Sequence, residues 1–147
     1  MEKENIIKLL NKALADEWLA FYQYWIGAKI VEGKMKEETI DELNEHAEDE
    51  YRHAGMLVKL ILKYEGTPLI SPYKWKEYTN CGYDEPSDPD TKVILQQNIK
   101  GERCAIETYK KLMEEIKEDN ETYEIIKEIY EDEIEHEEDL KKIFDRI

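Results

Sequence analysis

Asp49-Glu50-Tyr51-Arg52-His53 stands in the middle of one long amphipathic stretch, and Asp132-Glu133-Ile134-Glu135-His136 stands in the middle of another. In both motifs a glutamate precedes a histidine by three positions, and residues three apart share one face of a helix. Apolar residues recur every three or four positions on either side of each motif, which is the spacing of one helical face. The two motifs therefore place charged groups that can bind metal on faces that are otherwise apolar.

The same spacing continues through most of the chain and predicts four long helices. These helices are expected over residues 3–32, 36–65, 88–117 and 120–144. Gly33 and Gly66 are expected to cap the first two helices, and Asp88 with Pro89 to begin the third. Short connections within each pair make the paired helices antiparallel neighbours.

The connection between the second and third helices is much longer and holds all 4 prolines of the chain, within residues 67–89. A short helix is expected inside it, over residues 73–78, because Pro72 suits a helix start. No segment shows the sustained alternation of a strand. The sequence thus predicts an all-α fold in one domain, residues 1–147: a four-helix bundle of the ferritin-like type, with one long crossover between helices two and three.

Charge and composition limit the partners. The 147 residues carry a formal net charge of -15, from 36 acidic and 21 basic side chains, which argues against binding to nucleic acid. Residues 1–4 do not begin a basic and apolar leader, and no apolar stretch is long enough to cross a bilayer. We expect a cytoplasmic protein that binds neither nucleic acid nor membrane.

Each predicted helix carries one glutamate in the middle of its apolar face. These glutamates are Glu17, Glu50, Glu102 and Glu133. Burying a single ionised carboxylate without a partner costs roughly several kcal/mol, so four together require cations among them. With His53 and His136 added, the set matches the ligands that hold two divalent ions in carboxylate bundles.

The two halves of the sequence repeat one pattern, Glu-x-x-Ala-x-x-x-Tyr followed by Asp-Glu-x-x-His. A metal-bound imidazole usually donates its other N–H to a carboxylate that fixes its orientation. We therefore predict that Asp132 orients His53 and that Asp49 orients His136. Exposed aspartates on acidic helices are the alternative.

Three further polar residues lie on or near the inward faces. Tyr24 and Tyr109 end the repeated pattern two turns after a glutamate, so each is predicted either to hydrogen-bond a ligand carboxylate or to be an ordinary core tyrosine. His46 has no glutamate three positions before it. We expect a hydrogen-bonded structural histidine there, with an indirect role near the metal as the alternative.

The chain resembles the ferritin-like superfamily over nearly its whole length, and the spacing of the six ligands is most similar to the bacterioferritin and rubrerythrin type of site. The sequence has no Cys-x-x-Cys pair, which disfavours a classical rubrerythrin. Bacterioferritins place a haem-binding methionine directly after the second glutamate, where this chain has Tyr51. The resemblance implies two iron ions per chain. Zinc and manganese are alternatives, because glutamate and histidine also bind zinc and oxygen-rich sites admit manganese. Tyr51 in place of the methionine departs from the family pattern, so we expect no haem.

Residues 101–106, together with Cys81 in the crossover, resemble the Dps-like thioferritins. The resemblance implies oxidation of Fe(II) by hydrogen peroxide or O2, protection against oxidative stress, storage of ferric mineral and a homo-oligomeric cage of twelve subunits. The short helix expected in the crossover is similar to the one that Dps proteins place at a subunit contact.

Within that resemblance, Cys81 and Cys104 are a candidate disulfide or redox pair. Cys104 lies two residues after Glu102, roughly 200° around the helix, so it is not expected to bind the metal. A disulfide would clamp the crossover onto the third helix, and a reduced pair would supply electrons. Two unlinked thiols are the alternative.

These features predict a di-iron ferroxidase or peroxidase. One alternative is an iron store or metal buffer without catalytic turnover, and another is a rubrerythrin-like peroxidase. A third is a structural bundle in which zinc fills the site, since glutamate and histidine also bind zinc.

Overall fold

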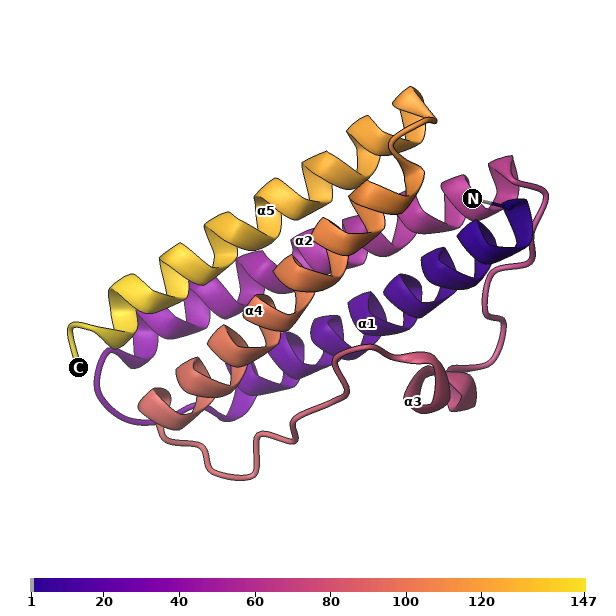
Figure 1. Ribbon diagram of the computed structural model, residues 1–147. Coiled ribbons are helices and arrows are strands. Elements are labelled where there is room, and N and C mark those ends of the chain that lie inside the picture. The colour runs from indigo at the N-terminus through magenta and orange to yellow at the C-terminus, as the bar shows by residue number, and fades with distance from the viewer. Residues whose placement is uncertain (1) are drawn as a thin grey trace.

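The computed structural model describes residues 2–147, which form an all-α bundle (Figure 1). Its elements are α1 (Lys3–Ile30), α2 (Lys36–Lys63), the 3-10 helix η1 (Pro72–Lys74), α3 (Trp75–Tyr78), α4 (Thr91–Ile116) and α5 (Asn120–Phe144). The predicted fold class, with its long crossover between the second and third long helices, is confirmed. The short helix expected in the crossover is also present, as η1 and α3.

Two helical hairpins build the bundle. The pair α1 and α2 and the pair α4 and α5 make the most extensive contacts, while α1 also touches α4 and α2 touches α5. The crossover runs back along the outside of α1, where α3 packs against that helix (Figure 1). Each of the four long helices therefore turns one face towards the same interior.

The third long helix begins later than predicted. Asp88–Pro89 does not start α4; Asp90 caps it, and the Asp90 side chain accepts a hydrogen bond of 3.1 Å from the backbone of Lys92. The reason is a tertiary contact, because Glu32 N–H donates to the carbonyl of Pro89 (2.7 Å) and Thr91 N–H donates to the carbonyl of Glu32 (2.9 Å). This pairing holds the chain extended just before the helix.

The predicted glycine caps are also corrected. α1 ends before Gly33 is reached, and Gly33, at φ +119°, serves the turn to α2 instead. At the end of α2 the left-handed residue is Glu65, with φ 63°, and Gly66 follows it. Gly66 is needed for close packing, because a Cβ there would lie 2.7 Å from a side-chain carbon of Ile7.

Two apolar clusters fill the interior, one towards each end of the bundle. The first includes the buried side chains Leu10, Leu14, Leu57, Ile61, Ile116 and Ile126. The second includes Tyr24, Leu43, Ile94, Leu95 and Leu140. Burying each such side chain contributes about 1.5–3 kcal/mol, so the two clusters hold the helices rigidly on both sides of the polar residues between them.

A membrane crossing requires a long and strongly apolar helix, and residues 2–147 contain none.

Candidate metal centre

All six residues predicted as metal ligands meet between the two apolar clusters. Glu17 comes from α1, Glu50 and His53 from α2, Glu102 from α4, and Glu133 and His136 from α5. None of the six is more than 3% exposed. We refer to them together as the six-residue cluster.

The six-residue cluster divides into two overlapping groups. Ligand atoms of Glu17, Glu50, His53 and Glu133 all lie within 4.8 Å of one another. The same holds for Glu50, Glu102, Glu133 and His136. Glu50 and Glu133 belong to both groups, so these two glutamates would be shared if each group held one cation.

Several atoms of the cluster make no hydrogen bond within residues 2–147. They are one oxygen of Glu17, both carboxylate oxygens of Glu50 and of Glu133, and Nδ1 of His53. Nδ1 of His53 is 3.2 Å from Glu50 Oε1 and 3.3 Å from Glu17 Oε1. Ligands on a common ion at about 2.1 Å are about 3 Å apart, so these atoms fit a divalent metal well.

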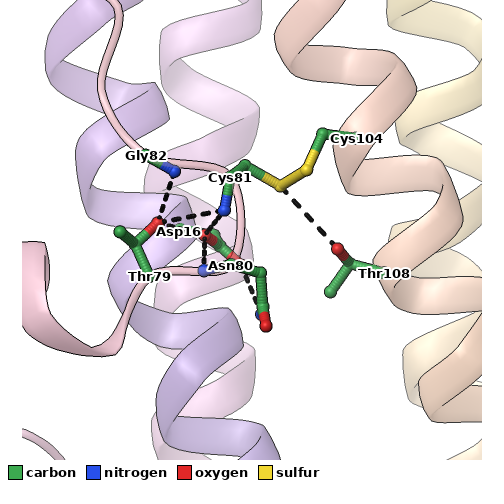
Figure 2. Close-up of a disulfide and its surroundings, with 7 residues drawn as sticks. All are labelled: Asp16, Thr79, Asn80, Cys81, Gly82, Cys104 and Thr108. Carbon is green, nitrogen blue, oxygen red and sulfur yellow. Dashed lines mark hydrogen bonds between the residues drawn. A yellow bond between two sulfur atoms is a disulfide. The ribbon is translucent and has the colours of Figure 1, made fainter.

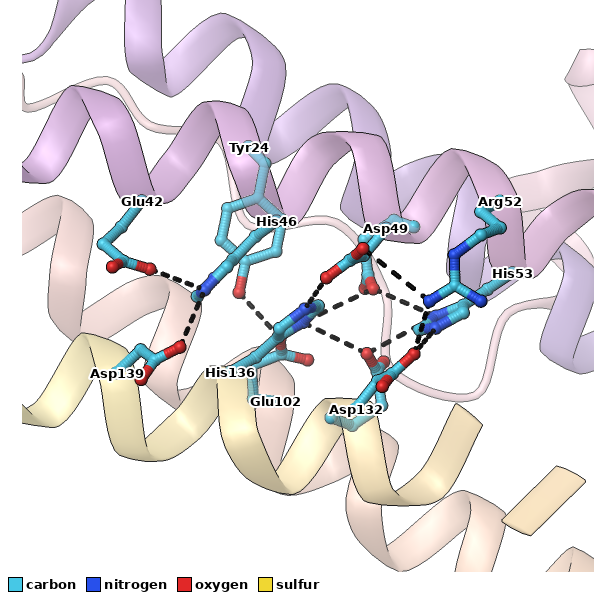
Figure 3. A network of polar contacts seen from close by, with 12 residues as sticks. Tyr24, Glu42, His46, Asp49, Arg52, His53, Glu102, Asp132, His136 and Asp139 are labelled. Atoms are coloured by element: carbon cyan, nitrogen blue, oxygen red, sulfur yellow. Dashed lines mark hydrogen bonds and ion pairs between the residues drawn. The ribbon is translucent and has the colours of Figure 1, made fainter. Parts of the chain in front are cut away.

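The outer nitrogens of both histidines face aspartates from the opposite helix. Nε2 of His53 is 2.7 Å from Asp132 Oδ2, and Nε2 of His136 is 2.8 Å from Asp49 Oδ2 (Figure 3). These are the pairs that the sequence predicted. Each contact turns the other ring nitrogen, Nδ1, towards the glutamates.

The two tyrosines reach across the bundle. The hydroxyl of Tyr24, in α1, donates a hydrogen bond of 2.7 Å to Glu102, in α4, and the hydroxyl of Tyr109, in α4, donates to Glu17, in α1. Both tyrosines are fully buried. Of the two possibilities open from the sequence, the structure shows the hydrogen bond to a cluster glutamate.

Burial and crowding shift the proton affinities of the cluster. Burial, followed by the charge of Glu50, raises the pKa of Glu17 to about 7 and that of Glu102 to about 6. Burial alone would lower the pKa values of His53 and His136, but the carboxylates around them outweigh it and raise both far above the ordinary value. A cation entering the cluster must therefore displace protons, so its affinity rises with pH.

The crossover is fastened beside the cluster by Asp16, which the sequence did not single out. Its carboxylate accepts hydrogen bonds from the backbone N–H groups of Asn80 (2.8 Å) and Cys81 (3.0 Å) and from the hydroxyl of Thr79 (Figure 2). Asp16 precedes Glu17 as Asp49 precedes Glu50, so this recurring Asp-Glu pair was a usable signal.

A disulfide joins Cys81 to Cys104, with 5.8 Å between their Cα atoms (Figure 2). It ties the crossover to α4, and Cys104 lies outside the six-residue cluster, as the helical geometry predicted. The disulfide and the glutamates line one cavity of about 400 Å³. Its small lining residues, Ala20, Gly101 and Ala105, leave the space between them open.

The first expectation for His46, a hydrogen-bonded structural side chain, was wrong, whereas its alternative, an indirect role near the metal, stays a prediction. His46 is 1% exposed, yet neither ring nitrogen makes a hydrogen bond within residues 2–147. Its ring stacks on His136 with 4.0 Å between ring centroids, and burial lowers its pKa to about 3. Besides Asp16, sequence reasoning also missed Arg52, whose guanidinium contacts Asp132 at 2.6 Å.

The bundle and its paired carboxylate and histidine groups define a ferritin-like protein. The protein-family model of the ferritin-like domain matches residues 7–147, so the chain belongs to the ferritin-like family. The resemblance seen in the sequence is confirmed. Among solved structures, it is similar to a dodecameric thioferritin, the bacterioferritin-related protein from Bacteroides fragilis. The two are 42% identical with a TM-score of 0.95, over 97% of this chain and 85% of that one.

Two curated relatives carry related names. The chain is 30% identical to a DNA protection during starvation protein from Pyrococcus furiosus over 140 residues, which are 93% of this chain and 75% of that protein. It is 33% identical to a bacterial ferritin from Paramagnetospirillum magnetotacticum over 85 residues, which are 58% of this chain. That match spans only 50% of the bacterial ferritin.

Proposed function

We propose that the protein binds two ferrous ions as substrate in the six-residue cluster and oxidises them with hydrogen peroxide or O2. One observation carries the proposal: two groups of buried side chains share Glu50 and Glu133, and several of their atoms have no hydrogen-bond partner among residues 2–147. Four carboxylates balance the charge of two divalent ions. Carboxylate oxygens also favour Fe(III), the product of the reaction.

The reaction with peroxide balances with no further reactant. Two Fe(II) and one H2O2 take up two protons and give two Fe(III) and two H2O, so each iron supplies one electron. Two adjacent ions deliver both electrons to one peroxide, which avoids releasing a one-electron oxygen radical. The protein's part is to bind, space and orient the two ions, and the cavity beside the disulfide supplies room for a small oxidant.

The histidines and tyrosines act through orientation. Asp132 and Asp49 fix the rings of His53 and His136, so that Nδ1 of each ring faces the ions. Tyr24 holds Oε2 of Glu102, and Tyr109 holds Oε2 of Glu17. Oε1 of Glu17 has no hydrogen-bond partner within residues 2–147 and is free to bind. No side chain in this scheme acts as a nucleophile.

Storage of the oxidised iron is part of the proposal, because the relatives include a protein named as a bacterial ferritin. We also propose a homo-oligomer of twelve subunits, because the Bacteroides fragilis protein is described as dodecameric and is 42% identical over nearly the whole chain. The net charge of -15 does not favour direct contact with a phosphate backbone, so the absence of a nucleic-acid partner stays a prediction.

Anaerobic titration with Fe(II), followed by peroxide, tests the proposal. We expect two ions bound per chain, one peroxide consumed per two ions, and a native mass near twelve chains. A Glu50→Ala/His136→Ala variant that keeps full activity would show that the six-residue cluster is not the site. Repeated peroxide consumption in the presence of a reductant indicates an enzyme, whereas a single stoichiometric uptake indicates a store.

A further inference from the structure

A third group of potential ligands lies next to the six-residue cluster. Glu42 and His46 come from α2, and Asp139 comes from α5. Nε2 of His46 is 3.1 Å from Glu42 Oε2 and 3.8 Å from Asp139 Oδ2 (Figure 3). One ligand atom from each residue lies within 4.8 Å of the other two. We call these three residues the Glu42 cluster.

The polar atoms at the centre of the Glu42 cluster are buried without partners. His46 is 1% exposed, and both its ring nitrogens, like Oε2 of Glu42, make no hydrogen bond in the described part of the chain. A buried polar atom that is left without a partner costs about 1–3 kcal/mol. Two such atoms facing each other at 3.1 Å are therefore accounted for if a cation lies between them and Asp139.

Solvent reaches the Glu42 cluster from one side. The side chains of Glu42 and Asp139 are 29% and 31% exposed, whereas that of His46 is 2% exposed. A hydrated ion can therefore arrive at the two carboxylates and exchange one water for the imidazole behind them. The remaining coordination positions stay open to water.

We propose that Glu42, His46 and Asp139 bind a third divalent transition-metal ion, separate from the pair in the six-residue cluster. One imidazole and two carboxylates suit zinc, cobalt, ferrous iron or manganese better than the all-oxygen ions calcium and magnesium. The site borders the pair, because the ring of His46 stacks on that of His136. Glu42 and Asp139 belong to neither of the two groups that would hold the pair, although a ligand atom of His46 also lies within 4.8 Å of Glu102 and His136.

Cobalt(II) is a suitable probe, because it accepts nitrogen and oxygen ligands and is located by its anomalous scattering. Crystals of the protein grown with Co(II) should show an anomalous peak between Glu42, His46 and Asp139. In solution, Co(II) retained per chain after gel filtration in about 0.15 M salt should fall by one ion in Asp139→Asn. The matched control Glu138→Gln loses the same charge from the exposed neighbouring position and should retain as many ions as the unmodified protein.

The test compares the number of Co(II) ions that each variant retains per chain. The expected loss of one ion therefore does not depend on how many ions the six-residue cluster holds. Should Asp139→Asn fail to fold, as judged by circular dichroism, Glu42→Gln replaces it with the same expected loss of one ion. Equal retention by the unmodified protein and the folded variant would overturn the proposal, because a metal site at these residues must lose its ion when a ligand is removed. The absence of an anomalous peak at the three residues would overturn it as well.

Discussion

One oxygen of Asp132, Oδ2, accepts from both Arg52 and His53, at 2.6 Å and 2.7 Å. Arg52 precedes His53 in α2, while Asp132 precedes Glu133 in α5, so the contact joins α2 to α5 at the level of the six-residue cluster. Hydrogen bonding to His53, supported by Arg52, lowers the pKa of Asp132 from its ordinary value. The aspartate therefore stays ionised and holds the tautomer of His53 that directs Nδ1 to the glutamates of the six-residue cluster.

Asp132→Asn should accordingly weaken metal binding roughly 10–100-fold, because the amide holds the His53 ring less firmly and does not stabilise its N–H to the same degree. The measurement is the dissociation constant for Co(II) or anaerobic Fe(II). Glu131→Gln, an exposed position on the same helix, is the control and should leave the constant unchanged. Equal affinity in Asp132→Asn and the control would contradict the role assigned to Asp132.

The two cross-helix tyrosines give a second prediction. Tyr109→Phe removes the only hydrogen bond that orients Glu17 from α4, and such bonds to charged groups contribute about 1.5–3 kcal/mol. We expect slower Fe(II) oxidation, by roughly tenfold, with the oligomer intact. Tyr22→Phe, which alters a half-exposed tyrosine of α1, should oxidise iron at the normal rate. A normal rate in Tyr109→Phe would mean that Tyr109 only fills the core.

The meeting of the six residues in one buried cluster was predictable for a physical reason. A glutamate in the middle of an apolar helical face is costly unless a cation compensates it, and the same anomaly on four helices indicates cations shared among them. The periodicity of the apolar residues then indicated the inward face of each helix. The six residues could therefore be predicted to meet without any knowledge of contacts. Their burial at 3% exposure or less agrees with that argument.

The residues that the sequence did not reveal depend on contacts between distant positions. Arg52 and Asp132 are 80 positions apart, and Asp16 and Asn80 are 64 apart. Neither pair lies in a periodic pattern, so no local signal names the partner. The late start of α4 has the same origin, because it follows from the pairing of the chain before the helix with Glu32.

The disulfide leads to a prediction about stability. Cys81 and Cys104 are 23 positions apart, and closing a loop of that size stabilises the folded state by about 3 kcal/mol through the unfolded chain. Reduction should lower the melting temperature by roughly 6–12 °C. A Cys81→Ser/Cys104→Ser variant should melt at the reduced temperature with or without reductant. An unchanged melting temperature on reduction would show that Asp16 alone fastens the crossover.

The start of α5 predicts a pH dependence. The hydroxyl of Tyr64 donates to Asp119, the N-cap of α5, and lowers the pKa of Asp119 from 3.8 to about 2. A carboxyl whose pKa is lowered by folding stabilises the folded state at pH values above its ordinary pKa. This contribution is lost as the pH falls towards 2. Because the Asp119 side chain is 33% exposed, solvent screening limits its contribution to the free energy of unfolding to about 1 kcal/mol.

Urea unfolding of the unmodified protein and of Asp119→Asn measures this contribution. The two should differ by about 1 kcal/mol at pH 6, and the difference should shrink as the pH is lowered below 4. Glu118→Gln, which changes an exposed charge one residue earlier, should show no such convergence. A difference that is the same at every pH would assign the effect to packing rather than to the charge of Asp119.

The effect of Glu133 on the stability of the metal-free protein can be measured separately from its effect on metal binding. Both carboxylate oxygens of Glu133 are buried and make no hydrogen bond in the part of the chain that the structure describes. Burial, followed by the charge of Glu102, raises the pKa of Glu133 well above its ordinary value. Glu133→Met replaces this group by an apolar one of similar volume, which is often neutral or stabilising by about 1–4 kcal/mol. Without metal, the variant should melt at or above the temperature of the unmodified protein.

With metal the order should reverse. An ion at one hundred times its dissociation constant stabilises the unmodified protein by about 2.7 kcal/mol per site, whereas Glu133→Met has lost a ligand of both ions and gains little. Glu135→Met, an exposed change on the same helix, should behave as the unmodified protein in both conditions. Suppose that Glu133→Met melts at a lower temperature than the unmodified protein without metal, and that metal raises its melting temperature as much as that of the unmodified protein. Glu133 would then be a structural residue, because a ligand destabilises the fold when the site is empty and stabilises it when the site is filled.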